Sequence, residues 1–292
     1  MADRVAQVAA HLAFPRGLLQ GQVAIVTGSG QGIGAETARL FALEGAKVVV
    51  TDIDAKKAGA VADEINKSGG QALAVPGDIT SPTYPEELVA AAAKFGGGKL
   101  HILINNAGYT WDAVIHRMSD AQWDAILLCH ATAPFRLIRA AAPYFRQTDG
   151  EPRCIVNISS TSGLHGNIGQ ANYSLAKAGL VGLTKTLAKE WGPKFGVRCN
   201  AVAFGQVDTR LTAAKEAGEY VTGPGGEKIA LGIPQKQLDA RKGAGGAVDY
   251  PDIPLRRPGT ATEAARSILA VASPLFGYVT GQVISVTGGR NM

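Results

Sequence analysis

The feature that most limits the possible folds is a strand followed by a glycine-rich turn and a helix near the start of the chain. Gln22 to Thr27 is an apolar run that predicts a strand, and Gly28 to Gly34 forms the turn. Ala35 to Leu43 then predicts a helix that stops at Gly45. Glycines in this setting let a backbone approach a pyrophosphate, whose charge the helix N-terminus meets. A glycine pattern alone would be weak evidence, but this order is typical of a nucleotide-binding unit.

Strand and helix continue to alternate along the rest of the chain. Further strands are expected at 47–51, 71–76, 100–104, 155–158, 197–202 and 282–287. Helices are expected at 55–68, 85–95, 120–139, 171–189 and 261–273, the third of them interrupted or bent near Pro134. We therefore predict an α/β fold: a single doubly wound Rossmann-type domain, with a central parallel sheet of about seven strands and helices on both faces.

No internal repeat or break in composition divides the chain. We place the domain at 21–292 and treat 1–20 as an N-terminal extension, in which Ala6 to Leu12 could form a short helix. The segment 210–258 is the least regular, with glycine clusters at 223–226 and 243–246. A loop of this length in a domain is usually functional or disordered.

Composition limits the class of protein. With 46% hydrophobic and 18% charged residues the chain resembles an ordinary soluble globular protein. Its net charge of +5 is scattered, which gives nucleic-acid binding little support. The cysteines at 129, 154 and 199 form neither a disulfide framework nor a zinc pattern, so we predict no metal site. No run approaches the ~20 apolar residues of a membrane span. We expect a cytoplasmic protein without membrane attachment.

The candidate catalytic residues follow the strand at 155–158. Ser160 stands at its carboxyl end, where open α/β sheets place their ligands. Tyr173 and Lys177 are four residues apart on the next helix and so share a face. A free phenol titrates near pH ~10, and a nearby ammonium should lower that pKa toward the range that a general acid or base requires. Taken alone, this tyrosine–lysine spacing is more often an ordinary solvated helix pair. The serine thirteen residues before Tyr173 and the glycine turn favour catalysis.

With these residues in place, the chain resembles the short-chain dehydrogenase/reductase family. The resemblance rests on Ser160, Tyr173 and Lys177, on the turn at 27–34 and on Asn105-Asn106-Ala107-Gly108, and it extends from about 21 to 289. The run 166–173, GNIGQANY, further resembles the 3-oxoacyl-[acyl-carrier-protein] reductase branch. The resemblance implies that Tyr173 exchanges a proton with the substrate, Ser160 orients its oxygen, and Lys177 contacts the nicotinamide ribose. It also implies a homotetramer built on the helices around 120–146 and 171–191 together with the C-terminal strand region.

One position departs from the family pattern. His130 stands where most members have the asparagine that completes the catalytic set. A similar histidine occurs in hydroxyacyl-CoA dehydrogenase domains of multifunctional enzymes. Because imidazole can donate and accept, we include His130 as a catalytic candidate in a proton relay. The alternative is a packed helix histidine.

The cofactor candidates lie at the ends of successive strands. Asp52 comes twenty residues after Gly32, where a carboxylate can accept hydrogen bonds from a ribose and would repel the 2′-phosphate of NADP. The alternative is a turn aspartate. By family position, Asp78 contacts adenine, 106–108 lies at the adenosine, Gly205 to Thr209 wraps the nicotinamide end, and 210–258 covers the substrate. The full predicted set is Gly28, Gln31, Gly32, Ile33, Gly34, Asp52, Ile53, Asp78, Ile79, Asn106, Ala107, Gly108, Tyr173, Lys177, Gly205, Val207 and Thr209.

The sequence thus predicts an NAD(H)-dependent oxidoreductase that interconverts a secondary alcohol and a ketone, with NAD(H) preferred over NADP(H). By resemblance, its small-molecule substrate is a 3-oxoacyl thioester of an acyl carrier protein or CoA. Dehydrogenation of a hydroxyacyl-CoA, a steroid or a polyol remains open, because fold does not fix substrate. A non-catalytic NAD-binding regulator is the alternative from another functional class.

Overall fold

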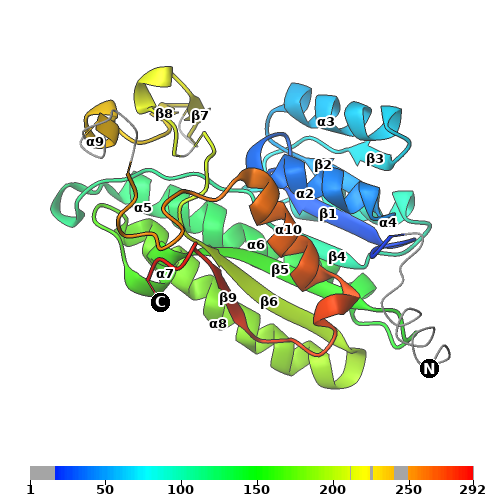
Figure 1. The fold of residues 1–292 in the computed structure, drawn as a ribbon. Coiled ribbons are helices and arrows are strands. Elements are labelled where there is room, and N and C mark those ends of the chain that lie inside the picture. Colours follow the sequence, from blue (N-terminus) through cyan, green and yellow to red (C-terminus); the bar gives the residue numbers. More distant parts are fainter. Residues whose placement is uncertain (1–16, 211, 224–225, 240–248, 292) are drawn as a thin grey trace, which may run out of the picture.

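Seven parallel strands form the central sheet, in the order β3-β2-β1-β4-β5-β6-β9 (Figure 1). Their bounds are β1 Val23–Thr27, β2 Lys47–Thr51, β3 Gln71–Ala74, β4 Ile102–Asn105, β5 Arg153–Ser160, β6 Val197–Phe204 and β9 Val283–Val286. This computed structural model describes residues 17–210, 212–223, 226–239 and 249–291. The predicted α/β fold with about seven parallel strands is confirmed.

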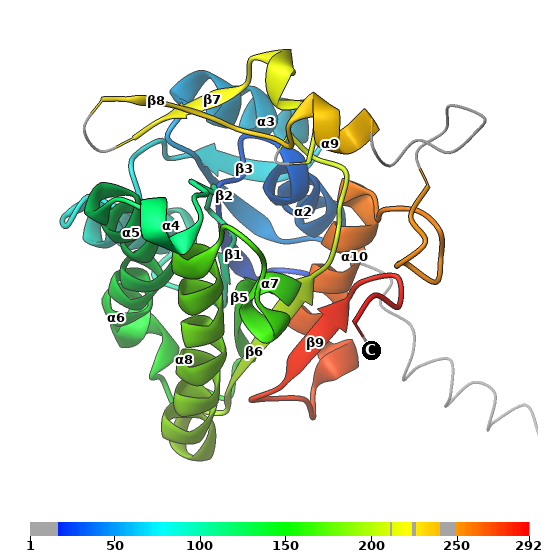
Figure 2. The same cartoon turned by 90° about the vertical axis from the view of Figure 1, so that its left-hand side faces the viewer.

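Helices cover both faces of the sheet, as predicted. One face carries α2 Gly32–Leu43, α3 Ala55–Lys67 and α10 Ala261–Ala272. The other carries α4 Tyr84–Phe95, α6 Ala133–Phe145 and α8 Ala171–Phe195. Figure 2 shows the two layers from the side, with α10 and α8 on opposite sides of the strands. The five residues of β1 are all buried, which is expected for a parallel strand that has helices above and below it.

The strand order creates a crevice at the carboxyl edge of the sheet. The chain proceeds outward from β1 through β2 to β3 and then returns to β4 on the other side of β1. At such a switch point the loops after β1 and β4 diverge, which leaves room for a ligand. The glycine turn follows β1 directly, and the Asn105–Gly108 turn begins at the last residue of β4. Both predicted nucleotide-binding turns therefore border the same crevice.

Several helices and strands differ in length from the sequence prediction. β5 extends at both ends of 155–158 because β6 supplies hydrogen-bonding partners along its whole length, from Arg153 to Ser160. α8 continues past Lys189 to Phe195 and contains Pro193. The helix predicted at 120–139 is divided into α5 Asp120–Leu127, a π-helical turn at Leu128–Thr132, and α6. The irregular turn comes just before Pro134, which lacks a backbone N–H and lies in the first turn of α6.

The segment 210–258 has more regular structure than its glycine clusters suggested. Its described part contains an antiparallel hairpin, β7 Tyr220–Thr222 and β8 Lys228–Ala230, and the short helix α9 Gln235–Asp239. In Figure 1 the hairpin stands above the carboxyl edge of the sheet. The prediction of a long irregular loop is corrected to this extent.

The start of the described chain already belongs to the folded body. Leu19 is completely buried in the core on the α2 side of the sheet, and the Leu18 N–H donates to the Glu44 carboxylate over 2.8 Å. The short helix predicted at Ala6 to Leu12 lies outside the described residues. The boundary at residue 20 therefore stays a prediction.

Candidate active site

Ser160, Tyr173 and Lys177 meet at the carboxyl end of β5. Ser160 is the last residue of that strand, and its hydroxyl accepts a hydrogen bond of 3.1 Å from the Ser162 N–H at the start of α7 Thr161–His165. Tyr173 and Lys177 lie in the first two turns of α8, on the face predicted from their spacing. The ammonium of Lys177 is 5.5 Å from the centre of the Tyr173 ring. The structure therefore brings the three predicted catalytic side chains together.

Backbone contacts fix Lys177 in the interior. The residue is 4% exposed, and its Nζ donates a hydrogen bond of 2.7 Å to the carbonyl of Ile158 on β5. The Ser159 hydroxyl donates over 2.9 Å to the Lys177 carbonyl and ties the helix to the strand. Gly163 allows α7 to pack here, since a Cβ at that position would lie 2.7 Å from the Lys177 backbone. Helix, strand and turn together determine where the ammonium sits.

Burial shifts the pKa values of both titratable groups. It raises the pKa of Tyr173 to about 12, although a hydrogen bond with the Ser160 side chain lowers it in part. It lowers the pKa of Lys177 to about 8. We expected the ammonium to lower the pKa of Tyr173 below that of a free phenol, and for the protein by itself this expectation is wrong. The cost of desolvating a phenolate is the dominant effect, and the ammonium is directed at the Ile158 carbonyl.

His130 completes the cluster from the π-helical turn. It is 2% exposed, and its ring lies edge-on to that of Tyr173 with centroids 5.0 Å apart. Its Nε2 is 2.7 Å from the Tyr109 carbonyl oxygen, while the buried Nδ1 has no hydrogen-bonding partner in the described part of the chain. Burial lowers the pKa of His130 well below its ordinary value, so the ring is neutral at pH 7. A neutral ring whose Nε2–H donates to Tyr109 leaves Nδ1 as a bare acceptor beside the tyrosine.

Gly108 makes room for this histidine. A Cβ at Gly108 would lie 2.1 Å from the His130 Cε1 atom. The turn after β4 therefore supports the catalytic cluster as well as the crevice. Asn106 holds the same turn to the glycine turn, because its Nδ2 donates to the Thr27 carbonyl over 2.8 Å and its own N–H donates to the Thr27 hydroxyl over 2.9 Å.

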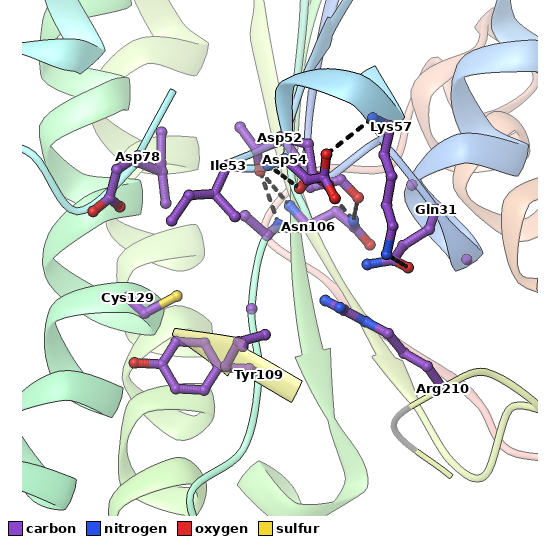
Figure 3. Close-up of a pocket in the computed structure, with 18 of the residues that line it drawn as sticks. Gln31, Asp52, Ile53, Asp54, Lys57, Asp78, Asn106, Tyr109, Cys129 and Arg210 are labelled. Carbon is purple, nitrogen blue, oxygen red and sulfur yellow. Dashed lines mark hydrogen bonds between the residues drawn. The ribbon is translucent and has the colours of Figure 1, made fainter. Parts of the chain in front are cut away.

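A cleft of about 870 Å³ lies beside these residues, over the glycine turn (Figure 3). Thirteen of the predicted cofactor residues line it: Gly28, Gln31, Gly32, Ile33, Gly34, Asp52, Ile53, Asp78, Ile79, Asn106, Ala107, Gly108 and Thr209. The predicted residues Tyr173, Lys177, Gly205 and Val207 lie outside this lining. Gly205 packs closely on Thr287, and Val207 is buried and bridges to Gly259. Their predicted cofactor contacts stay predictions.

The glycine turn fits a dinucleotide phosphate. Gly34 must lack a side chain, because a Cβ there would lie 2.2 Å from the Gly28 carbonyl oxygen. At Gly32, which has a φ of 57°, a Cβ would project into open space with Thr209 Cγ2 3.8 Å away. Gln31 provides no side-chain cap for α2, so the first N–H groups of that helix remain available to an anion. The residues present thus suit the pyrophosphate of a nicotinamide dinucleotide.

Asp52 follows the last residue of β2, next to the glycine turn, and is 8% exposed. One of its oxygens accepts from the Gly30 N–H and the other from the Asp54 N–H, each over 3.0 Å. These two hydrogen bonds show that Asp52 stabilises the backbone of its turn, which was the alternative to a cofactor contact. Because each carboxylate oxygen has two lone pairs and the side chain lines the cleft, Asp52 can still accept from a ribose hydroxyl.

Several lining residues were missed by the sequence analysis. Tyr109, Cys129 and Asp54 are each adjacent in sequence to a predicted site residue. That adjacency is the only sequence feature from which their place in the lining could have been predicted. Lys57 reaches back to Gln31, with its Nζ 2.9 Å from Oε1. The larger omission is a second wall formed by Arg210 and by 218–223, the segment that contains β7. Nothing local in the sequence places that hairpin opposite the glycine turn.

Comparison with known proteins identifies the family. A family model described as short chain dehydrogenase matches residues 22–219. The chain belongs to this family. It is 36% identical to the 3-oxoacyl-[acyl-carrier-protein] reductase FabG of Thermotoga maritima over 93% of this chain and 98% of that protein. It is 43% identical to the hydroxyacyl-CoA dehydrogenase ChsB1 of Mycobacterium tuberculosis over 67% of this chain and 64% of that protein. A third relative, the peroxisomal hydratase-dehydrogenase-epimerase of Neurospora crassa, is 42% identical over 63% of this chain and 21% of that protein.

Family membership gives the general chemistry. The protein is a short-chain dehydrogenase/reductase that acts on CH–OH groups and uses a nicotinamide cofactor. The described residues include no group of three or more His, Cys, Asp or Glu side chains that could hold a metal ion. Within the same residues, one helical stretch, Asp120–Phe145, matches a membrane span by length and mean hydropathy alone, although it contains no unbroken apolar run of that length. Half of its most apolar window is buried, since it comprises α5, the π-helical turn and α6 of the domain core.

Proposed function

We propose that this enzyme interconverts a 3-oxoacyl thioester and its 3-hydroxy partner with NAD(H). The observation that carries the proposal is the position of Ser160 and Tyr173 beside a cleft bordered by the glycine turn, with the Lys177 ammonium buried behind them. A ketone at this corner would have a hydroxyl and a phenol within reach of its oxygen and a nicotinamide cofactor on its open side.

Each protein group has a distinct part in the reaction. The cofactor supplies or accepts the hydride at the carbinol carbon. Ser160 donates a hydrogen bond to the substrate oxygen and orients it. Tyr173, with a pKa raised to about 12, carries its proton at neutral pH and can donate it to the oxygen as the ketone is reduced. Lys177, whose pKa burial lowers to about 8, is cationic below that pH and stabilises the phenolate that Tyr173 forms when it gives up its proton.

We assign His130 to a relay behind Tyr173. Its Nδ1 is a buried acceptor without a partner among the described residues, at a ring that touches Tyr173. A buried polar atom of this kind usually binds ordered water. Such a water would connect the tyrosine–lysine pair to Nδ1. The competing interpretation is that His130 only packs against Gly108.

The relatives support a thioester substrate. One of them is named for a 3-oxoacyl thioester of an acyl carrier protein, and another for a hydroxyacyl thioester of CoA. The first carries a ketone and the second a hydroxyl, so with the hydroxyl at C3 their acyl groups differ by one hydride and one proton, and they also differ in the carrier. Dehydrogenation of a hydroxyacyl-CoA is the same chemistry in the opposite direction, and the greater identity to the second relative keeps it as the main alternative. Steroid and polyol substrates are further alternatives.

The proposed preference for NAD(H) rests on Asp52. A 2′-phosphate would have to approach this carboxylate and that of Asp54, both of which line the cleft. Lys57, a cation that could offset them, donates to Gln31. The ribose hydroxyl of NAD would instead gain an acceptor.

Incubation with NADH and a panel of ketones, including a 3-oxoacyl thioester, tests the proposal. Consumption of NADH with formation of the 3-hydroxy product is the expected result. Binding of NADH without turnover of any ketone would favour the non-catalytic regulator. We also expect a cytoplasmic homotetramer built on α5, α6 and α8 together with the region of β9, and a monomeric mass in light scattering at micromolar protein would contradict the tetramer.

A further inference from the structure

Arg210 is a charged side chain in the cofactor cleft that lacks an ionic partner among the residues that the structure describes. It follows Thr209 directly and projects its guanidinium into the cleft, toward Gln31 and Asp52 (Figure 3). Asp52, Glu219 and Asp54 attract it electrostatically, but it forms no ion pair or hydrogen bond with any described residue. Burial lowers the pKa of Arg210, because the guanidinium has lost water without gaining a close carboxylate.

The glycine turn has no cationic side chain of its own that could neutralise a bound phosphate. Residues 28–34 contain no lysine or arginine. Lys57, the other cationic residue in the lining, donates to Gln31. A pyrophosphate carries about two negative charges, of which the N-terminus of a helix offsets roughly half of one. The remaining charge calls for a cation, and guanidinium is well suited to phosphate because its fork can donate two hydrogen bonds.

The position of the chain at Arg210 indicates which phosphate it meets. The preceding residue, Thr209, places its methyl group 3.8 Å from where a Gly32 Cβ would stand, over the first turn of α2. The pyrophosphate must sit over that turn. A 2′-phosphate would lie farther along the loop, next to the Asp52 and Asp54 carboxylates, where its binding is least favourable.

We propose that Arg210 binds the pyrophosphate of the dinucleotide from the side opposite the glycine turn, and so clamps NAD(H) and NADP(H) alike. This inference rests on the proposed cofactor site and adds a binding residue from the second wall of the cleft. Arg210 fixes how tightly a dinucleotide is held, while Asp52 sets which dinucleotide is preferred.

Calorimetric binding of ligand fragments tests the assignment. ADP contains the pyrophosphate, adenosine lacks phosphate, and adenosine 2′,5′-bisphosphate has a 2′-phosphate but only a single phosphate at the 5′ position. We expect Arg210→Met to weaken ADP and NADH by about ten- to a hundredfold, since one or two charge-assisted hydrogen bonds are lost. Adenosine affinity should stay within about twofold of the wild type. The matched control is Arg139→Met, which removes an exposed arginine of α6 and should leave all affinities unchanged.

The alternative outcomes separate this inference from the proposed function. Equal affinity of wild type and Arg210→Met for ADP would overturn the clamp, as would a loss confined to the 2′,5′-bisphosphate and NADPH. Failure of the wild type to bind any dinucleotide would instead overturn the proposed function. Arg210→Lys keeps the charge without the fork, so its ADP affinity should fall between the other two. If Arg210→Met does not fold, the test rests on Arg210→Lys. An affinity of Arg210→Lys for ADP equal to that of the wild type would contradict bidentate binding by the guanidinium.

Discussion

The two ends of the active-site region differ in how far their charged and titratable side chains are exposed to water. At the catalytic end, Lys177 and His130 are almost fully buried, and burial is the largest influence on their pKa values and on that of Tyr173. At the adenosine end, charged side chains of both signs line an open cleft. The first end is suited to holding and releasing a proton, and the second to choosing and retaining a charged cofactor. Substitutions at the two ends should therefore change different kinetic quantities.

The largest effect is expected at the catalytic end. Tyr173→Phe removes the proton donor and should lower turnover by roughly 10²–10⁴-fold, while affinity for the cofactor barely changes. The measurement is kcat for ketone reduction together with Kd for NADH. Tyr278→Phe is the control, because that side chain is fully exposed and its loss should change neither value. Activity of Tyr173→Phe near that of the wild type would show that another group moves the proton.

The second-largest effect is expected at the adenosine end, on the preference between NADH and NADPH. Like charges a few Å apart at a partly exposed site repel by about 1–4 kcal/mol, which predicts a preference for NADH over NADPH of roughly ten- to several-hundredfold. Asp52→Ser should narrow that gap, mostly through better binding of NADPH. The ratio of kcat/KM for the two cofactors measures both claims. Equal use of NADH and NADPH by the wild type would mean that Asp52 serves only the backbone of its turn.

A smaller effect on kcat at the catalytic end distinguishes a proton-relay role of His130 from a role in packing alone. His130→Leu removes the Nδ1 acceptor and should lower kcat by about tenfold, as expected for roughly one lost hydrogen bond. His130→Asn retains a donor and an acceptor and should recover most of the rate. We also expect His130→Leu to alter the pH dependence of kcat without changing KM for NADH. Equal rates in the leucine and asparagine variants would indicate that His130 only fills space.

The smallest effect concerns stability and the burial of Lys177. Its pKa is about 8 in the folded protein and about 10.5 in an unfolded chain, so the unfolded state binds the proton more readily between these values. The cost of burying the charge is therefore present in full below pH 8 and disappears as the pH rises toward 10.5. Thermal unfolding from pH 7 to 10.5 should show wild type gaining stability relative to Lys177→Met. A pH-independent difference would mean that Lys177 is not desolvated in solution.

The contrast between the ends also explains what could be predicted from the sequence. The catalytic end comes mainly from β5, α7 and α8, which are consecutive, so the helical spacing of Tyr173 and Lys177 was sufficient to place them on one face. The glycine turn was equally local. Arg210 and the hairpin, by contrast, reach the cleft only through the tertiary fold, and no periodic pattern carries that information. The direction of the Tyr173 pKa was also out of reach, because spacing reveals a neighbouring charge but not how much water the fold excludes.

Isotope transfer tests the central claim most directly. The wild-type enzyme would be incubated with NADH that carries deuterium at nicotinamide C4 on one face, then separately on the other, with a 3-oxoacyl thioester as substrate. The account predicts one deuterium at C3 of the 3-hydroxyacyl product from one of the two labelled cofactors and none from the other. A 3-hydroxy product without deuterium from either cofactor, or no product while NADH remains bound, would contradict hydride transfer in this cleft.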